Sequence, residues 1–169
     1  DGADARALSR FTLDKGSLCA CSLEVEMPVG LMSDGVETAA VLEAGVELGA
    51  PRDDGLGVDE TLDLTLVSPA MRIATQGSGL FESALEEIQR QLPANTYLRI
   101  CFGCGLSDYS PAGLGLFGSL ACFRDDKDAY RAVRTKRDLF EIWVRGEGVQ
   151  ETHVCSEFER RVPGTGYRG

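Results

Sequence analysis

The feature that most constrains this chain is a pair of cysteines separated by two residues, Cys101 and Cys104, followed by a glycine-rich run. A tight turn between two such cysteines lets both sulfurs face one point, as metal binding requires. Two more cysteines, Cys122 and Cys155, lie downstream. Four thiolates complete a tetrahedral site, so we expect Cys101, Cys104, Cys122 and Cys155 to bind one structural zinc ion.

Other interpretations of the cysteines stay open. Cysteine is a common buried residue, so some of the four could be core side chains. His153 could replace one sulfur, although we expect it beside the metal or on the surface. Cys19 and Cys21 share one face of a predicted strand, where they are core residues or part of a second site. A redox dithiol would need a helix that begins at Cys101, and the glycines that follow exclude one.

Charge narrows the class of partner. The 169 residues include 17 basic and 27 acidic side chains, a formal net charge of −10. Phosphate binding needs a basic face, so we expect no nucleic-acid partner. We expect no membrane association either, because no apolar run is long enough to span a bilayer and no signal-peptide pattern is present. The chain begins with Asp1, which leaves room for a removed N-terminal segment. The cysteine spacing favours a reducing compartment, the cytoplasm.

The first half of the chain predicts a β-sheet. Apolar and polar residues alternate over 18–27, 36–48 and 61–66, and a shorter β-type run covers 71–75. Alternation of this kind is typical of strands with one buried face. Pro28 and Gly30 are expected to end the first strand, and 33–35 to form a turn. We therefore expect an antiparallel sheet over residues 10–76.

The second half predicts helices. Phe81, Leu85, Ile88 and Leu92 recur at helical spacing, and Pro93 follows them. Further helices are expected over 125–133 and 137–144, then a strand over 149–155 and a mobile tail from Pro163. The expected class is α+β: one domain over 1–169, sheet-rich over 10–76, with helices around a four-cysteine metal site over 78–160.

Two motifs in the central segment resemble catalytic or cofactor signatures. Residues 113–118 match a GxGxxG pattern, but dinucleotide binding needs a strand before it and a helix that opens inside it. We expect an ordered loop there instead. Ser107 or Ser110 could join His153 and Asp108 in a Ser–His–Asp site. Hydrogen bonding within the loop is the more ordinary role for Asp108 and Ser110.

Three strings carry a resemblance to a known family: CFGCGLSDYSPAGLGLFGSLACFR, RTKRDLFEIW and VQETHVCSEFE. Together they resemble an uncharacterised bacterial family, largely actinobacterial, with a CxxC pair, an SDYSPxGxGLFG loop, a Cys-Phe pair and a distal cysteine. The resemblance is closest over residues 80–160. It implies a shared fold and a metal site, but no reaction.

Two classes of function fit these observations. The first is a zinc-stabilised, non-enzymatic binding module that grips a protein partner, such as an immunity-type protein or a stabilising accessory subunit of an enzyme. The alternative is a small enzyme or enzyme subunit of a natural-product pathway, with a small-molecule substrate. In either class we expect Asp108, Tyr109 and Ser110 to recognise the partner, because an aromatic residue among small polar ones is typical of interfaces. Tyr109 could equally pack inward against the metal site.

Overall fold

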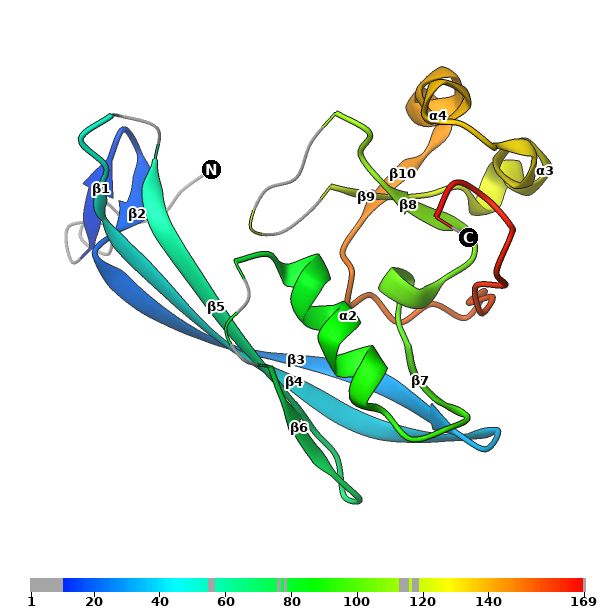
Figure 1. Ribbon diagram of the computed structural model, residues 1–169, viewed down its shortest axis with the longest axis horizontal. Coiled ribbons are helices and arrows are strands. Elements are labelled where there is room, and N and C mark those ends of the chain that lie inside the picture. The colour runs from blue at the N-terminus through cyan, green and yellow to red at the C-terminus, as the bar shows by residue number, and fades with distance from the viewer. Residues whose placement is uncertain are drawn as a thin grey trace.

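The computed structural model describes residues 11–54, 57–75, 77, 79–112, 116 and 119–168. The protein is mostly β, with a curled antiparallel sheet and a few short helices, and so falls broadly in the α+β class (Figure 1). None of the helices in these ranges is long and apolar enough to cross a membrane.

The main sheet has five antiparallel strands in the order β6-β5-β4-β3-β7. The strands are β3 (Cys21–Ser33), β4 (Val36–Pro51), β5 (Val58–Val67), β6 (Arg72–Ala74) and β7 (Thr96–Arg99). A small hairpin of β1 (Thr12–Asp14) and β2 (Ser17–Cys19) lies at one end of the sheet (Figure 1). The expected antiparallel sheet in the first half of the chain is therefore confirmed.

The β3–β4 hairpin follows from local turn chemistry. Asp34 and Gly35 both have positive φ, 47° and 83°, the conformation of a two-residue turn that matches the strand twist. The predicted strand over 18–27 was wrong at both ends. Ala20, with φ 51°, separates β2 from β3. β3 then continues through Pro28, where it has β4 on one side only among the described residues, and an edge position tolerates proline.

Helix α2 (Phe81–Gln91) covers one face of the main sheet (Figure 1). Its buried side chains are those of the predicted stripe, Phe81, Leu85 and Ile88, together with Ala84. They join a core with the buried strand residues, including Leu42, Leu62, Leu64, Leu66 and Leu98. Side chains repeat every 3.6 residues on the helix and every 2 residues on the strands, so each element has one apolar face, and these faces pack against each other.

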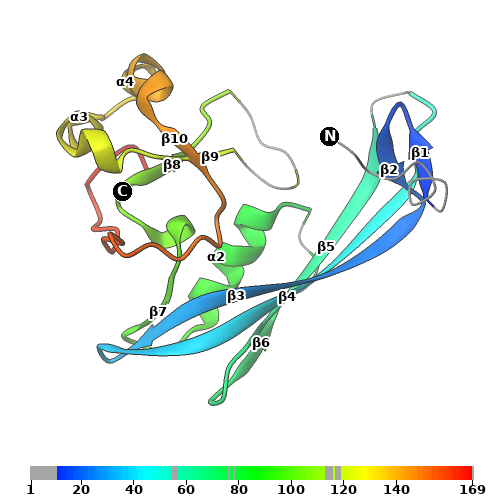
Figure 2. The same cartoon turned by 180° about the vertical axis from the view of Figure 1, so that it is seen from behind.

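A second, smaller layer follows the main sheet (Figure 2). Its three-stranded sheet has the order β10-β9-β8. Two short helices lie beside it, and Thr135 and Asp138 form a capping box at the start of the second. The elements are β8 (Ser107–Tyr109), β9 (Leu120–Cys122), α3 (Lys127–Ala132), α4 (Lys136–Ile142) and β10 (Glu147–Val149), with 3-10 turns at Cys101–Gly103, Arg124–Asp126 and Trp143–Arg145.

The segment after β10 differs from expectation. β10 spans Glu147–Val149, so the strand predicted over 149–155 is wrong for all but its first residue. Residues 151–153 instead lie along the Cys101–Gly103 turn, where the N–H groups of Cys101 and Phe102 donate to the carbonyls of His153 and Glu151, both at 2.9 Å. The tail from Pro163, expected to be mobile, packs back onto the same turn through Arg168.

Candidate functional site

The CxxC pair lies in a short 3-10 turn that begins where β7 ends. The N–H of Cys104 donates to the carbonyl of Cys101 at 3.1 Å, and both cysteines are buried. A 3-10 turn has three residues per turn, so residues i and i+3 point to the same side. The two cysteines thus belong to one tight turn, the local geometry that the spacing predicted.

Two other segments bring the remaining cysteines to this turn. Cys122 lies on β9 directly opposite Ser107 of β8, and the Ser107 hydroxyl donates to the carbonyls of Cys101 at 2.6 Å and Cys104 at 3.1 Å. Cys155 follows the segment that pairs with Cys101, and its sulfur accepts the N–H of Glu157 at 3.3 Å. We refer to Cys101, Cys104, Cys122 and Cys155 as the cysteine cluster.

The thiols of the cysteine cluster lie within electrostatic range of one another. Burial raises the pKa of Cys101 to about 12, and Cys104, Cys122 and Cys155 add to this rise. Burial also raises the pKa of Cys122, against hydrogen bonding and charge from Arg124. Without a cation, Cys101 and Cys122 are protonated thiols. A divalent ion would reverse this preference, because a coordinating thiol loses its proton.

The described side chains do not form a metal site in their present orientations. Within the described ranges, no group of three or more His, Cys, Asp or Glu side chains is arranged to hold a metal ion. The side chain of His153 points to solvent and lies outside the cysteine cluster. Cys19 is buried in β2 and Cys21 is half-buried in β3. Zinc binding by Cys101, Cys104, Cys122 and Cys155 therefore stays a prediction.

A buried polar network adjoins the cysteine cluster. Asp108 is 1% exposed, and the hydroxyl of Tyr130 from α3 donates to Asp108 Oδ2 at 3.0 Å. Arg161 in turn donates to the hydroxyl of Tyr130 at 3.2 Å and to the carbonyls of Cys104, at 2.7 Å, and Ser107. Burial raises the pKa of Tyr130 to about 12, so this hydroxyl remains a donor at neutral pH.

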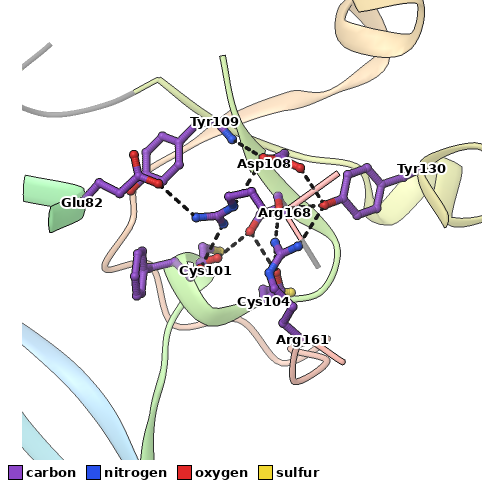
Figure 3. Close-up of polar contacts among 10 residues, drawn as sticks. Glu82, Cys101, Cys104, Asp108, Tyr109, Tyr130, Arg161 and Arg168 are labelled. Atoms are coloured by element: carbon purple, nitrogen blue, oxygen red, sulfur yellow. Dashed lines mark hydrogen bonds and ion pairs between the residues drawn. The ribbon is translucent and has the colours of Figure 1, made fainter. Parts of the chain in front are cut away.

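Arg168 occupies the centre of a second group of contacts, which we call the Arg168 cluster: Glu82, Asp108, Tyr109 and Arg168 (Figure 3), together with Phe102. Its guanidinium pairs with Asp108 at 3.3 Å and Glu82 at 3.5 Å, and donates to the carbonyl of Phe102 at 3.1 Å. It also lies over the rings of Tyr109 and Phe102, 4.8 and 5.7 Å from their centroids. One cation therefore serves two carboxylates and two aromatic faces.

The electrostatics of the Arg168 cluster reflect its burial. Burial raises the pKa of Glu82, and the charge of Arg168 opposes that rise. Burial raises the pKa of Tyr109 strongly, with a further contribution from the carboxylate of Glu151. The tyrosine is thus a neutral group whose ring forms one wall of the cluster.

The predicted recognition residues are mostly interior. Asp108 is buried and Tyr109 is 6% exposed. Tyr109 therefore packs inward, which is the alternative position considered from the sequence. Ser110 is partly exposed, and its hydroxyl accepts the N–H of Ala112 at 3.2 Å, a loop contact. Recognition of a partner by Asp108, Tyr109 and Ser110 stays a prediction. The glycines at 113, 115 and 118 and Phe117 lie outside the described residues.

No Ser–His–Asp arrangement is assembled by these residues. The hydroxyl of Ser107 donates to two backbone carbonyls, Asp108 is paired with Tyr130 and Arg168, and His153 is exposed. Arg161 and Arg168 were not predicted as site residues. Their sequence signal is faint: acids that become buried or half-buried need cations, and the tail supplies arginines among glycines and one proline.

The fold and this site define a class of α+β protein in which a cysteine-bearing turn joins a curled sheet to a smaller β-layer. Within that class, the chain belongs to DUF6304, a family of unknown function, whose model matches residues 1–107. Membership of an uncharacterised family is thus confirmed, although the match covers the sheet, α2 and the CxxC turn rather than 80–160. No curated protein and no solved structure matches the chain.

Proposed function

We propose that this protein is a zinc-stabilised, non-enzymatic domain that binds another protein, with Cys101, Cys104, Cys122 and Cys155 as the zinc ligands. The observation that carries the zinc proposal is the convergence of three separate segments on one turn. β7 leads into the turn, β9 lies opposite Ser107, and residues 151–155 run beside it. Coordination of an ion by this cluster would require its side chains to rotate from their present orientations.

A structural role for the ion follows from the ligand set. Four thiolates fill the tetrahedral shell of zinc and leave no position for water or substrate. The polar side chains nearby are also committed to one another: Asp108 to Tyr130 and Arg168, and Ser107 to the turn. Mutual pairing of this kind holds the segments together. These contacts favour a stabilising centre over a catalytic one.

The test is metal content compared between matched variants. Protein purified without added metal should hold about one zinc per chain, and Cys101→Ser and Cys104→Ser should lose it together with thermal stability. Cys21→Ser is the control, because Cys21 is a half-buried thiol on the main sheet, outside the cysteine cluster. The visible spectrum of cobalt-substituted protein would report the number of thiolate ligands. Stable, metal-free protein with four titratable thiols in the cluster would overturn the zinc proposal.

The enzymatic alternative has less support from the geometry. A shallow apolar cleft of about 490 Å³ lies at the β1–β2 end of the sheet, and its lining includes Leu18, Leu23, Leu48, Lys15 and Glu60. Its lining also includes Leu116 but neither carboxylate of the Arg168 cluster, Glu82 or Asp108. Turnover of a small molecule by the isolated chain would favour the enzyme. A stoichiometric protein complex would favour the binding module.

A further inference from the structure

Among the described residues, one edge of the main sheet has no neighbouring strand along much of its length. β7 pairs with β3 only from Gly30 to Ser33. Between Cys21 and Val29, β3 pairs with β4 and, within the part of the chain that the structure describes, with no second strand. Alternate residues of an edge strand turn their N–H and C=O groups outward. Nine residues at strand rise span about 30 Å, and Pro28 is the one residue among them without an N–H group.

The outer face of the sheet beside this edge is acidic. Glu24 and Glu26 of β3 lie on it, and Glu24 and Asp63 flank Gly45 from either side. Because Gly45 has no side chain, a depression of about 320 Å³ remains among these carboxylates. Within the described ranges no cation pairs with Glu24, Glu26 or Asp63, whereas Arg72 neutralises Glu43 at 2.8 Å. The edge therefore presents unmatched negative charge on one face.

The opposite face of the same edge is apolar. Leu23 and Met27 are partly buried, and Val25 is 39% exposed. An added strand would place alternate side chains on the two faces. A strand complementary to this edge would carry basic residues on the acidic face of the sheet and apolar residues against Val25.

A second copy of this chain is a poor occupant of the edge. If two β3 strands paired antiparallel about Val25, Glu24 of one copy would face Glu26 of the other. Like charges directly opposite each other destabilise a strand pair. The acidic pattern thus disfavours self-association and favours a basic partner.

From this edge and its charge we propose that residues Cys21 to Val29 of β3 accept an extended segment of a partner protein, one that alternates Lys or Arg with apolar residues. Main-chain hydrogen bonds would supply affinity and the alternating side chains would supply specificity, as in other cases of strand addition. This inference rests on the proposed protein-binding function and names the chemistry of the partner. It does not depend on the zinc ion.

The probe is an end-blocked nine-residue peptide of alternating Lys and Val, added to the full chain. Fluorescence anisotropy should show saturable binding, and amide hydrogen exchange should slow at alternate residues between Cys21 and Val29. A Lys-Pro peptide of equal charge is the control, because proline cannot donate ladder hydrogen bonds. Binding of both peptides with equal affinity, or no alternate protection, would overturn the proposal.

Matched charge reversals locate the site. Glu24→Lys with Glu26→Lys should weaken binding about tenfold or more, because charges on the bound face become repulsive. Asp63→Lys makes the same change of charge as Glu24→Lys alone and in the same row of the sheet, but on β5, beyond Gly45 from the β3 edge. It should weaken binding much less than Glu24→Lys alone. An equal loss from Asp63→Lys would mean general attraction to the acidic face and would refute strand addition at β3.

Two further results would assign the edge to another occupant and so refute the proposal. Protection in the free monomer of the β3 amides that face away from β4 would show that the chain covers its own edge. A dimer in analytical ultracentrifugation that Val25→Lys dissociates would show a second copy there. The zinc measurement tests a different proposal. If the peptide protects β3 but the protein holds no zinc, this inference stands and the zinc proposal fails. If the protein holds zinc but the peptide does not protect β3, only this inference fails.

Discussion

At the scale of single residues, the pairing of Arg168 with buried Asp108 and half-buried Glu82 explains why the tail is ordered. Asp108 is almost fully buried, and an unpaired charge at such a place is costly. Arg168 is itself only 19% exposed and serves both Asp108 and Glu82. One side chain near the end of the chain therefore stabilises a carboxylate sixty residues away in sequence.

Arg168→Ala should destabilise the protein by about 2–4 kcal/mol, because it leaves two carboxylates without their cation in a poorly solvated place. Arg145→Ala is the control: Arg145 pairs with Asp126 on the surface, at 2.8 Å, and its loss should cost less than about 1 kcal/mol. Urea unfolding of the two variants measures the difference. Equal midpoints would show that the Arg168 contacts carry no stability.

The raised pKa of Glu82 predicts a dependence of stability on pH. The folded chain holds this proton more tightly than the unfolded chain, whose carboxyl has its ordinary pKa of 4.5. Stability from this group is therefore present at low pH and falls as the pH rises above 4.5. Glu82→Gln should remove that fall, so the free energy of unfolding of the parent should decline relative to the variant from pH 4.5 upward. Parallel pH profiles would contradict the assignment.

At the scale of elements, the segment after β10 acts as a strap across the Cys101–Gly103 turn. Its backbone pairs with the turn at Gly103 and Gly105, where the N–H of Arg161 donates to Gly103 and that of Gly105 to Glu159. Further along, Gly166 lies against the ring of Tyr130. The strap therefore bridges the turn and α3, the two elements between which Asp108 is buried.

Two glycines of the strap provide a matched test of this docking. Gly164 and Gly166 both have positive φ, 83° and 69°, so alanine is strained at either. A Cβ at Gly164 meets nothing within 4 Å, whereas one at Gly166 would lie 2.7 Å from the hydroxyl of Tyr130. Gly164→Ala should cost about 1 kcal/mol from strain alone. Gly166→Ala should cost about 1–3 kcal/mol more. Equal melting temperatures of the two variants would show that the strap is not seated on Tyr130.

At the scale of the whole molecule, two cores meet at the cysteine cluster. The larger core lies between the main sheet and α2, and it includes Cys101. The smaller core contains Phe123, Tyr130 and Leu139, with Phe123 stacked on Tyr130 at 5.0 Å between ring centroids. If zinc joins segments from both sides, its removal should loosen the smaller core first, because few apolar residues hold it.

The single tryptophan allows the order in which the two cores loosen to be measured. Trp143 packs edge-on against Phe123 in the smaller core, 6.1 Å between centroids. On addition of a chelator, Trp143 emission should shift to longer wavelength while the far-ultraviolet signal of the main sheet persists. A refolding control with added zinc should restore the emission. Simultaneous loss of both signals would show that the two cores form one cooperative unit.

The sequence alone determined the elements whose signals are local. Period-two alternation predicted the strands of the main sheet, the Asp34–Gly35 turn predicted its hairpin, and helical spacing with Pro93 predicted α2. The CxxC spacing likewise predicted that Cys101 and Cys104 share a turn. Each of these depends on residues within a few positions of one another, so a reading of the chain in order can find them.

The tertiary structure alone decided which charges are buried and what neutralises them. Nothing near Asp108 in sequence indicates that Tyr130 and Arg168 will face it, and the polar, glycine-containing tail reads as mobile until its arginines meet buried acids. The course of residues 150–155 was decided by the N–H groups of Cys101 and Phe102, not by strand propensity. Such contacts join distant segments, and their energy depends on the solvent exclusion that only the assembled fold creates.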